Sequence, residues 1–236
     1  MKKILSRIRR GIEDYDMIKD GDRIAVGVSG GKDSLTLLNA LSALRIFYPV
    51  KFEIVAMTLD MGFEGMDFRA VREFCAQLGV EFVTKETEIK TVLFDIRKEK
   101  NPCSLCARLR RGALNDLAVE NGCNAVALGH HNDDVIETFF LSLFYEGRLN
   151  CFSPVTYLSR KDINVIRPMI YVSERDIRSY AKTAGLPVVH NPCPMDGHSK
   201  REDMKTFIRE KSAEDRFFKE KMMNAIQTGL ENWKMK

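Results

Sequence analysis

The stretch Ser-Gly-Gly-Lys-Asp-Ser at residues 29–34 decides the fold, because of what stands on either side of it. The apolar run 24–28 before it is typical of a buried strand, and the run 35–38 after it, Leu-Thr-Leu-Leu, favours a buried helix. A glycine turn between a strand and a helix directs several backbone N–H groups into one concavity at the positive end of the helix dipole. The stretch therefore predicts a phosphate-binding loop.

The residue types of this loop suit that task. Gly30 and Gly31 let the main chain approach a ligand and adopt backbone angles that other residues avoid. Ser29 and Ser34 add two hydroxyl donors, and Lys32 adds a point charge. Asp33 would serve as a helix N-cap. The Walker spacing between glycine and Gly-Lys-Ser/Thr is absent, so this is not the loop of a standard P-loop NTPase. The alternative is an ordinary Gly-Ser turn that caps a helix.

Composition is ordinary for a soluble globular protein, with 236 residues, 44% hydrophobic and 30% charged. The net charge of +4 is compatible with an RNA partner without requiring one. No apolar run approaches the roughly 20 residues that span a bilayer, and no apolar signal-peptide core follows the basic N-terminus. We therefore expect a cytoplasmic protein with no membrane partner.

Strands and helices alternate through the first 150 residues. The expected strands are 23–28, 52–59, 81–84 and 125–128, and the expected helices are 34–47, 67–78, 104–121 and 133–144. This alternation predicts an α/β, Rossmann-like fold, in which a parallel sheet is flanked by helices. Ligands of such sheets bind beyond the carboxyl ends of the strands, where the 29–34 loop, Asp60 and Gly129 all fall. The pattern thus favours a single site.

The pattern changes after about residue 150. Short strands at 155–157 and 164–166 suggest a hairpin, a helix capped by Ser173 is expected to about Thr183, and two charged helices are expected at 199–212 and 214–229. At the other end, Ile4, Ile8 and Ile12 predict a surface helix with one buried stripe. We expect three parts, namely an N-terminal helix at 1–20, a nucleotide-binding domain at 21–190, and a cysteine loop with helices at 191–236.

A second motif, Leu-Gly-His-His-Asn-Asp-Asp-Val-Ile-Glu-Thr at residues 128–138, stands at a strand end and a helix start. Gly129 would permit a close approach of the backbone to a nucleotide. Asp133 and Asp134 offer hard oxygen ligands for Mg²⁺ beside phosphates, although one of them could simply cap the helix. His130 and His131 could be functional or structural.

The six cysteines do not form a disulfide framework in a chain of this kind. Cys75 and Cys123 read as core residues, and Cys151 is ambiguous. Cys103 and Cys106 have metal-ligand spacing at a loop-to-helix junction, where the helix N-terminus and the three arginines of 108–111 favour thiolates. Cys193, between two prolines, is a third candidate. The alternatives are a redox dithiol with an unrelated cysteine, or a zinc site completed by His190 and His198.

Three motifs together, at residues 29–34, 102–112 (Pro-Cys-Ser-Leu-Cys-Ala-Arg-Leu-Arg-Arg-Gly) and 128–138, resemble the TtcA-type tRNA 2-thiocytidine synthetases of the PP-loop ATPase superfamily. The likeness covers roughly residues 20–210. It implies a HUP-type PP-loop ATPase domain with a helical C-terminal extension. It also implies that cytidine 32 of tRNA is adenylated on its C2 carbonyl oxygen with ATP, releasing pyrophosphate, and that sulfur then displaces AMP.

The same resemblance implies the site residues. Three cysteines hold a 4Fe-4S cluster with one open iron, and here they are Cys103, Cys106 and Cys193; Asp196 stands where some relatives have a further cysteine. Mg²⁺ is expected near Asp134. The catalytic residues implied are Lys32, Asp33, Asp134 and Arg110. The ATP-binding residues implied are Val28, Ser29, Gly30, Gly31, Lys32, Asp33, Ser34, Met57, Asp60, Gly129 and Asp134.

The resemblance also implies partners, namely tRNA, a sulfur donor that supplies sulfide or persulfide derived from a cysteine desulfurase, and a second copy in a homodimer. Three basic groups could meet RNA, at 2–10, at 97–100 and at 200–211. Two other functions stay open at this point. One is a cytidine-modifying ligase like the tRNA lysidine synthetases, which leaves Cys103 and Cys106 unexplained. The other is a zinc- or redox-sensing nucleotide-binding module without catalysis.

Overall fold

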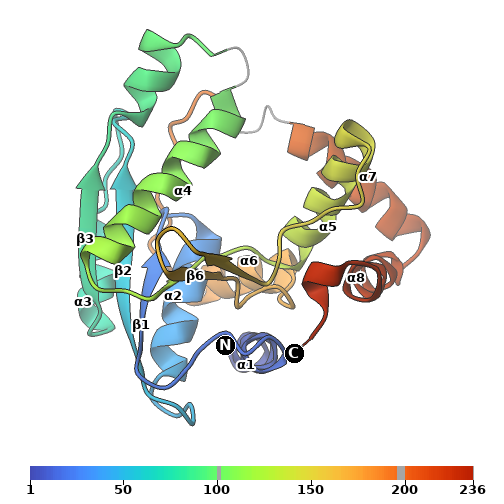
Figure 1. The fold of residues 1–236 in the computed structure, drawn as a ribbon, viewed down its shortest axis with the longest axis horizontal. Coiled ribbons are helices and arrows are strands. Elements are labelled where there is room, and N and C mark those ends of the chain that lie inside the picture. Colours follow the sequence, from blue (N-terminus) through green and yellow to red (C-terminus); the bar gives the residue numbers. More distant parts are fainter. Residues whose placement is uncertain (100–101, 196–199, 236) are drawn as a thin grey trace.

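One mostly parallel sheet organises the protein, which we describe from a computed structural model covering residues 1–99, 102–195 and 200–235. The strand order is β3-β2-β1-β4-β6-β5, and only the β5–β6 hairpin is antiparallel (Figure 1). The strands are β1 (Asp22–Gly27), β2 (Phe52–Asp60), β3 (Glu81–Glu86), β4 (Ala125–Ala127), β5 (Val155–Leu158) and β6 (Ile163–Ile166). The expected α/β class and the expected hairpin are confirmed.

Helices cover both faces of this sheet. They are α1 (Lys2–Asp14), α2 (Lys32–Leu44), α3 (Arg69–Gln77), α4 (Pro102–Glu120), α5 (Asn132–Leu141), α6 (Glu174–Thr183), α7 (Lys200–Glu214) and α8 (Phe218–Gly229). Short turns of π-helix at η1 (Thr91–Ile96) and η2 (Ser142–Glu146), and a 3₁₀ turn at η3 (Glu231–Trp233), complete the described chain. The sequence pattern did not predict η1 or η3, whereas the expected helix at 133–144 includes the first residues of η2.

The sheet is buried on both faces, as parallel sheets are. Ile24 and Val26 of β1 point into the larger apolar core, whereas Ala25 between them points into a smaller core against α4. Side chains alternate across a strand, so a continuous apolar run supplies both cores at once. This explains why residues 24–28 are apolar without interruption.

The two ends of the chain pack together. Ile4, Ile8 and Ile12 of α1 are buried, as the spacing predicts. The Tyr15 hydroxyl donates a hydrogen bond to the carbonyl oxygen of Trp233 (3.2 Å), and Trp233 itself is fully buried. Figure 1 shows the N- and C-termini side by side. The helices after residue 200 therefore share one core with the first helix.

A search of the described residues finds no helix that is both long enough and apolar enough to cross a membrane.

Candidate active site

The glycine loop follows β1 as expected, but its two glycines differ. Gly30 has a φ of +82°, which favours glycine, and an added Cβ there would lie 2.9 Å from the Cβ of Val189. Gly31 has an ordinary φ of −76°. The expectation that both glycines adopt angles closed to other residues is thus wrong for Gly31. Gly30 needs its freedom because the segment after α6 crosses it, with the Val189 N–H donating to the Gly30 carbonyl oxygen (2.9 Å).

Hydroxyl groups tie the loop together. The Ser34 Oγ accepts a hydrogen bond from the Ser29 N–H (3.2 Å) and donates to the Gly31 carbonyl oxygen (3.0 Å). Gly31, not Asp33, is the helix N-cap, so that expectation is wrong: Asp33 lies in the first turn of α2, one residue past its start. The Asp33 Oδ1 is buried and has no hydrogen-bond partner among the described residues.

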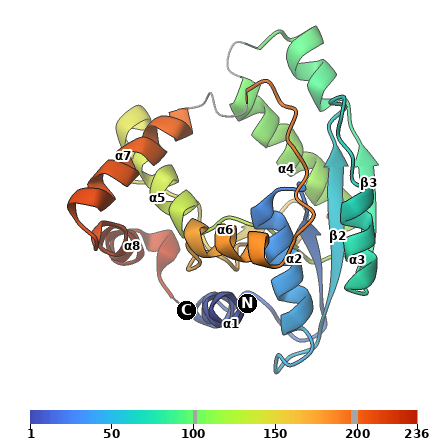
Figure 2. The same ribbon diagram turned by 180° about the vertical axis from the view of Figure 1, so that it is seen from behind.

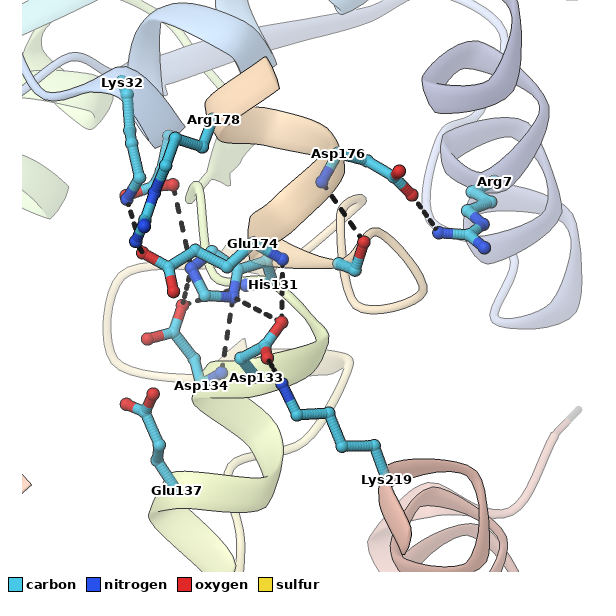
Figure 3. Close-up of polar contacts among 12 residues, drawn as sticks. Arg7, Lys32, His131, Asp133, Asp134, Glu137, Glu174, Asp176, Arg178 and Lys219 are labelled. Carbon is cyan, nitrogen blue, oxygen red and sulfur yellow. Dashed lines mark hydrogen bonds and ion pairs between the residues drawn. The ribbon is translucent and has the colours of Figure 1, made fainter. Parts of the chain in front are cut away.

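Lys32 lies between two carboxylates. Its Nζ is 3.0 Å from the Asp33 Oδ2 and 3.1 Å from the Glu174 Oε1, at the start of α6 (Figure 3). Burial opposes ionisation of Glu174, but hydrogen bonds and charges from Lys32 and Arg178 outweigh it and lower the pKa of Glu174 to about 2. Lys32 is therefore held by acids from two helices before any ligand arrives.

The second motif begins α5 with a capping box. His131 is the N-cap: its Nδ1 accepts from the Asp134 N–H (3.4 Å), and the Asp134 Oδ2 accepts from the His131 N–H (3.0 Å). The other Asp134 oxygen is 3.1 Å from Arg201 of α7. Asp133 is buried, accepts the Glu174 N–H (2.7 Å) and pairs with Lys219 of α8 (Figure 3). Both aspartates are thus engaged with protein groups.

Gly129 allows a different close approach from the expected one. A Cβ there would lie 3.1 Å from the backbone carbon of Asp33 and 3.1 Å from the backbone nitrogen of Ser34. The glycine therefore lets the end of β4 touch the first turn of α2, which locks the two motifs together.

A cavity of about 550 Å³ opens at the carboxyl ends of β1, β2, β4 and β6. Of the predicted residues it is lined by Val28, Ser29, Asp33, Ser34, Met57, Gly129 and Arg110. The residues that the resemblance placed at ATP but that do not line the cavity are Gly30, Gly31, Lys32, Asp60 and Asp134. Asp60 instead accepts the Gly62 N–H (2.9 Å) at the turn after β2.

The lining is positively charged. Among the described lining residues, three are arginines, Arg110, Arg111 and Arg167, and one is acidic, Asp33. Burial lowers the pKa of His130, another lining residue, to about 4, so it is neutral at pH 7. Such a cavity suits a polyanion. Sequence analysis missed Phe152 and Arg167; the available signal for Arg167 was its place directly after a strand, at the ligand-binding end.

Asp134 and Asp33 differ in how free their carboxylate oxygens are to bind Mg²⁺. Asp134 has one oxygen on Arg201 and the other on a backbone N–H, which leaves it poorly suited. Asp33 lines the cavity, and its buried Oδ1 has no hydrogen-bond partner among the described residues, with the His131 Nε2 3.7 Å away. A hard cation beside phosphates prefers such a carboxylate oxygen. Asp33 therefore fits the ion better than the expected Asp134.

The three candidate thiols lie close together. Burial raises the pKa of Cys106, the neighbouring charges of Cys193 and Cys103 raise it further, and Arg110 lowers it in part through a hydrogen bond. Figure 2 shows the segment after α6, in orange, running past α2 to the first turn of α4. The expectation that the surroundings favour the thiolate is wrong for Cys106, because burial outweighs Arg110.

The other thiols are core groups. Cys75 and Cys123 are buried in the larger and the smaller core, respectively, as expected. Cys151 is also buried, and its Sγ contacts the Val135 carbonyl oxygen at 3.4 Å. Burial raises the pKa of Cys151 to about 12 and that of Cys75 to about 11, so both stay protonated. None of these three is available as a ligand.

The arrangement can be compared with two kinds of metal centre. Within residues 1–99, 102–195 and 200–235, no three thiol, imidazole or carboxylate groups are placed to hold a single metal ion. His198 and Asp196 lie outside the described residues. Thiolates on different irons of a cubane stand further apart than ligands of one zinc ion, so neighbouring but separated thiols fit a cluster better.

Two of the basic groups expected to meet RNA are largely paired with acids. In α1, Lys3 and Arg7 both contact Asp176 of α6, while Arg9 and Arg10 contact acids one turn along. In α7 the pairs are Arg201 with Asp134 and Glu137, Lys205 with Glu202, and Lys211 with Glu214. These pairings favour a structural role for both groups.

Comparison with known proteins agrees with this geometry. Residues 2–211 match the PP-loop domain family. The chain is 40% identical over 231 residues to the tRNA-cytidine(32) 2-sulfurtransferase of Geobacter sulfurreducens, covering 95% of this chain and 89% of that protein. It is likewise 40% identical over 228 residues to the protein of that name from Geotalea daltonii, with coverage of 95% and 90%.

Solved structures give the same fold. The U34-tRNA thiolase NcsA from Methanococcus maripaludis with its [4Fe-4S] cluster aligns with a TM-score of 0.81 and 25% identity, over 98% of this chain and 78% of that one. An NH3-dependent NAD synthetase from Campylobacter jejuni, with a TM-score of 0.50 and 17% identity over 100% of this chain and 95% of that one, shares the fold alone. The motif geometry and these matches together show that the chain belongs to the PP-loop domain family and, within it, to the tRNA-cytidine(32) 2-sulfurtransferases.

Proposed function

We propose that this protein is an ATP-dependent tRNA sulfurtransferase that forms 2-thiocytidine at position 32 of tRNA. The observation that supports it most is the meeting of three thiols with a cationic cavity at the phosphate loop. Arg110 belongs to both places, because it lines the cavity and its charge lowers the pKa of the Cys106 thiol. A ligase that adds an amine would leave this thiol cluster without a use.

The first step is adenylation. The O2 lone pair of the cytidine forms a bond to the α-phosphorus of ATP, and the bond from that phosphorus to pyrophosphate breaks with its electron pair on pyrophosphate. Backbone N–H groups of residues 29–34 and the charge of Lys32 stabilise the leaving pyrophosphate. Asp33 would hold Mg²⁺, in place of the Asp134 expected from the sequence.

The second step exchanges oxygen for sulfur. Hydrosulfide forms the bond to C2, the C2–O bond breaks with its electron pair on AMP, and the sulfur loses its proton to water. Cys103, Cys106 and Cys193 would hold a 4Fe-4S cluster, which supplies an open iron to bind that sulfide. Arg110 lines the cavity and acts on the Cys106 thiol, so its charge would lie near both negative centres.

The partners follow from this chemistry. The substrate is tRNA in the cytoplasm, and the base at position 32 must leave its stack to reach the cavity, as single-stranded loop bases can. Sulfide or persulfide derived from a cysteine desulfurase would supply the sulfur. A homodimer stays a proposal drawn from the family resemblance.

Nucleoside analysis tests the function. Hydrolysed tRNA from cells that lack the gene should contain no 2-thiocytidine by mass spectrometry, and the wild-type gene should restore it. The Cys103→Ala and Cys193→Ala variants should fail to restore it and should bind almost no iron when purified without air. Cys75→Ala, which removes a core thiol, should restore it. Persistence of 2-thiocytidine in the deletion strain would refute the proposal.

A further inference from the structure

Arg167 is a buried cation in the lining of the cavity. It directly follows β6 and is 6% exposed. Among the described residues, its guanidinium hydrogen-bonds a carbonyl and a hydroxyl oxygen and no carboxylate. Burial, followed by the facing charge of Arg111, lowers the pKa of Arg167 to about 10, so it remains a cation at neutral pH. A buried charge without a partner is costly, and such groups are usually paired or functional.

The protein fixes the orientation of this guanidinium. One terminal nitrogen donates to the Ser153 carbonyl oxygen (2.6 Å) and to the Thr156 Oγ1 (3.2 Å). The guanidinium carbon Cζ of Arg167 lies 5.0 Å from the centre of the Phe152 ring. The Nε, in contrast, is buried and has no partner in the described part of the chain. One terminal nitrogen of the guanidinium is therefore held by the protein, whereas donors on the other side of the group stay unused at the wall of the cavity.

The platform beneath Arg167 is itself fixed from the far end of the chain. The Trp233 Nε1 donates to the Phe152 carbonyl oxygen (2.9 Å), and the Asn232 side chain donates to the Cys151 carbonyl oxygen (2.9 Å) and to the Ser153 Oγ (2.9 Å). The His130 ring packs against Phe152 with 4.9 Å between ring centres. This support makes Arg167 a preorganised donor, which is how sites that stabilise developing charge are built.

The position of Arg167 selects which group of the nucleotide it meets. The cavity runs along the sheet from Met57 in β2, past the loop after β1 and Gly129 after β4, to Arg167 after β6. The glycine loop with Lys32 takes the phosphates that leave. Arg167 lies on the opposite side of that loop from Met57. On the proposed function, the attack on the α-phosphorus comes from the side away from the leaving pyrophosphate, because attacking and leaving oxygens lie in line.

We infer that Arg167 is a further catalytic residue, which binds the α-phosphate of the nucleotide and supplies positive charge as AMP forms and departs. The α-phosphate is the group that is attacked in the first step and expelled in the second. A charged donor on it would act in both. The inference rests on the proposed function for the identity of the nucleotide, but the phosphate contact can be tested without tRNA.

The test compares two small ligands that differ by one phosphate. Binding of AMP and of adenosine is measured by calorimetry for the wild type, for Arg167→Gln and for Arg23→Gln. The ratio of AMP to adenosine affinity should fall by about tenfold to a hundredfold in Arg167→Gln, the loss expected for a charged hydrogen bond. Arg23 pairs with Glu53 and Glu81 at the other end of the sheet, so Arg23→Gln should leave the ratio unchanged.

Two outcomes would overturn the inference. One is an unchanged affinity ratio in an Arg167→Gln protein whose circular dichroism matches that of the wild type. The other, which needs no variant and covers a failure to fold, is a crystal structure of the wild type with AMP in which the phosphate makes no hydrogen bond to Arg167. If the ratio falls but deletion strains keep their 2-thiocytidine, the phosphate site stands and the thiolation proposal fails. If the ratio is unchanged but deletion strains lack 2-thiocytidine, the thiolation proposal stands and the inference on Arg167 fails.

Discussion

Single residues in this site already have partners before a substrate binds. Lys32 is held by Asp33 and Glu174, and Asp134 is held by Arg201 and the backbone of His131. Acids that hold a phosphate-binding lysine compete with the phosphate for it. The resting contacts of the site therefore predict how substitutions change ligand affinity.

Glu174→Gln should tighten ATP binding by about threefold to tenfold, because it removes a negative charge from beside both Lys32 and the incoming phosphates. Asp176→Asn is a matched control on the same helix turn, since Asp176 pairs with Lys3 and Arg7 instead. Isothermal titration calorimetry measures both. Weaker ATP binding in Glu174→Gln would mean that the carboxylate positions Lys32 and does not restrain it.

Glu137 should make stability depend on pH. Burial, with the charge of Asp134 adding to it, raises the pKa of Glu137 to about 7 from an ordinary value of 4.5. Between those values the folded state keeps a proton that the unfolded chain releases, so the free energy of unfolding falls as pH rises from about 4.5 to 7 and levels off above. The shift corresponds to about 3 kcal/mol in total.

Urea unfolding at pH 5, 6, 7 and 8 checks this effect by comparing the wild type with Glu137→Gln. The variant cannot ionise, so its stability relative to the wild type should rise between pH 5 and 7 and then stay constant. Arg201 lies 3.1 Å from the Glu137 Oε2, and the amide of Glu137→Gln keeps an acceptor oxygen for it, so the difference isolates ionisation of the carboxyl group. A difference that does not change with pH would contradict the assignment.

At the scale of elements, the strand–loop–helix unit around residues 29–34 depends on one glycine far more than on the other. Gly30 has a positive φ and lies against Val189. Gly31 has an ordinary φ, and a Cβ added there would have the Ser29 Oγ as its nearest non-adjacent atom, at 3.5 Å. A Cβ is strained at the first position and is accommodated at the second.

Gly30→Ala should therefore lower the free energy of unfolding by about 1–3 kcal/mol, the range for a strained backbone position. Gly31→Ala should change it by less than about 1 kcal/mol. Thermal or urea unfolding of the two alanine variants gives the comparison directly. Equal losses at both positions would show that the contact with Val189 carries no strain.

Element by element, the sequence predicts most of the sheet and less of the site. Continuous apolar runs such as 24–28 carry enough signal to place strands, and Gly79 and Gly185, which have a positive φ, stand just after the ends of α3 and α6. The π-helical turn η1 was missed because it has no periodicity of its own. Arg167 was missed because which strand lies beside β4 is a long-range property. The expected Asp33 cap was wrong because the helix begins two residues earlier, at Lys32.

At the scale of the whole molecule, the C-terminus supports the cavity. Trp233 is fully buried, and its indole N–H holds the backbone of Phe152. The expected division into parts at 1–20, 21–190 and 191–236 stays a prediction, although one apolar core includes residues from Ile4 to Trp233. Residues near the end of the chain thus hold the lining of the site in place from outside it.

Trp233→Phe should destabilise the protein by about 1–3 kcal/mol, because it leaves the Phe152 carbonyl oxygen without its donor and opens a small gap. It should also weaken AMP binding relative to adenosine, because Phe152 supports Arg167. Met235→Ala is a control close by, since Met235 is 61% exposed. Lower stability with an unchanged affinity ratio would confine Trp233 to a structural role.

The hydrogen bond between Val189 and Gly30 ties the polypeptide that carries Cys193 to the floor of the nucleotide cradle. On the proposed function, a movement of this loop when ATP binds would be passed along four residues to Cys193. The rate at which oxygen bleaches a cluster held by Cys193 would then depend on whether the nucleotide site is occupied.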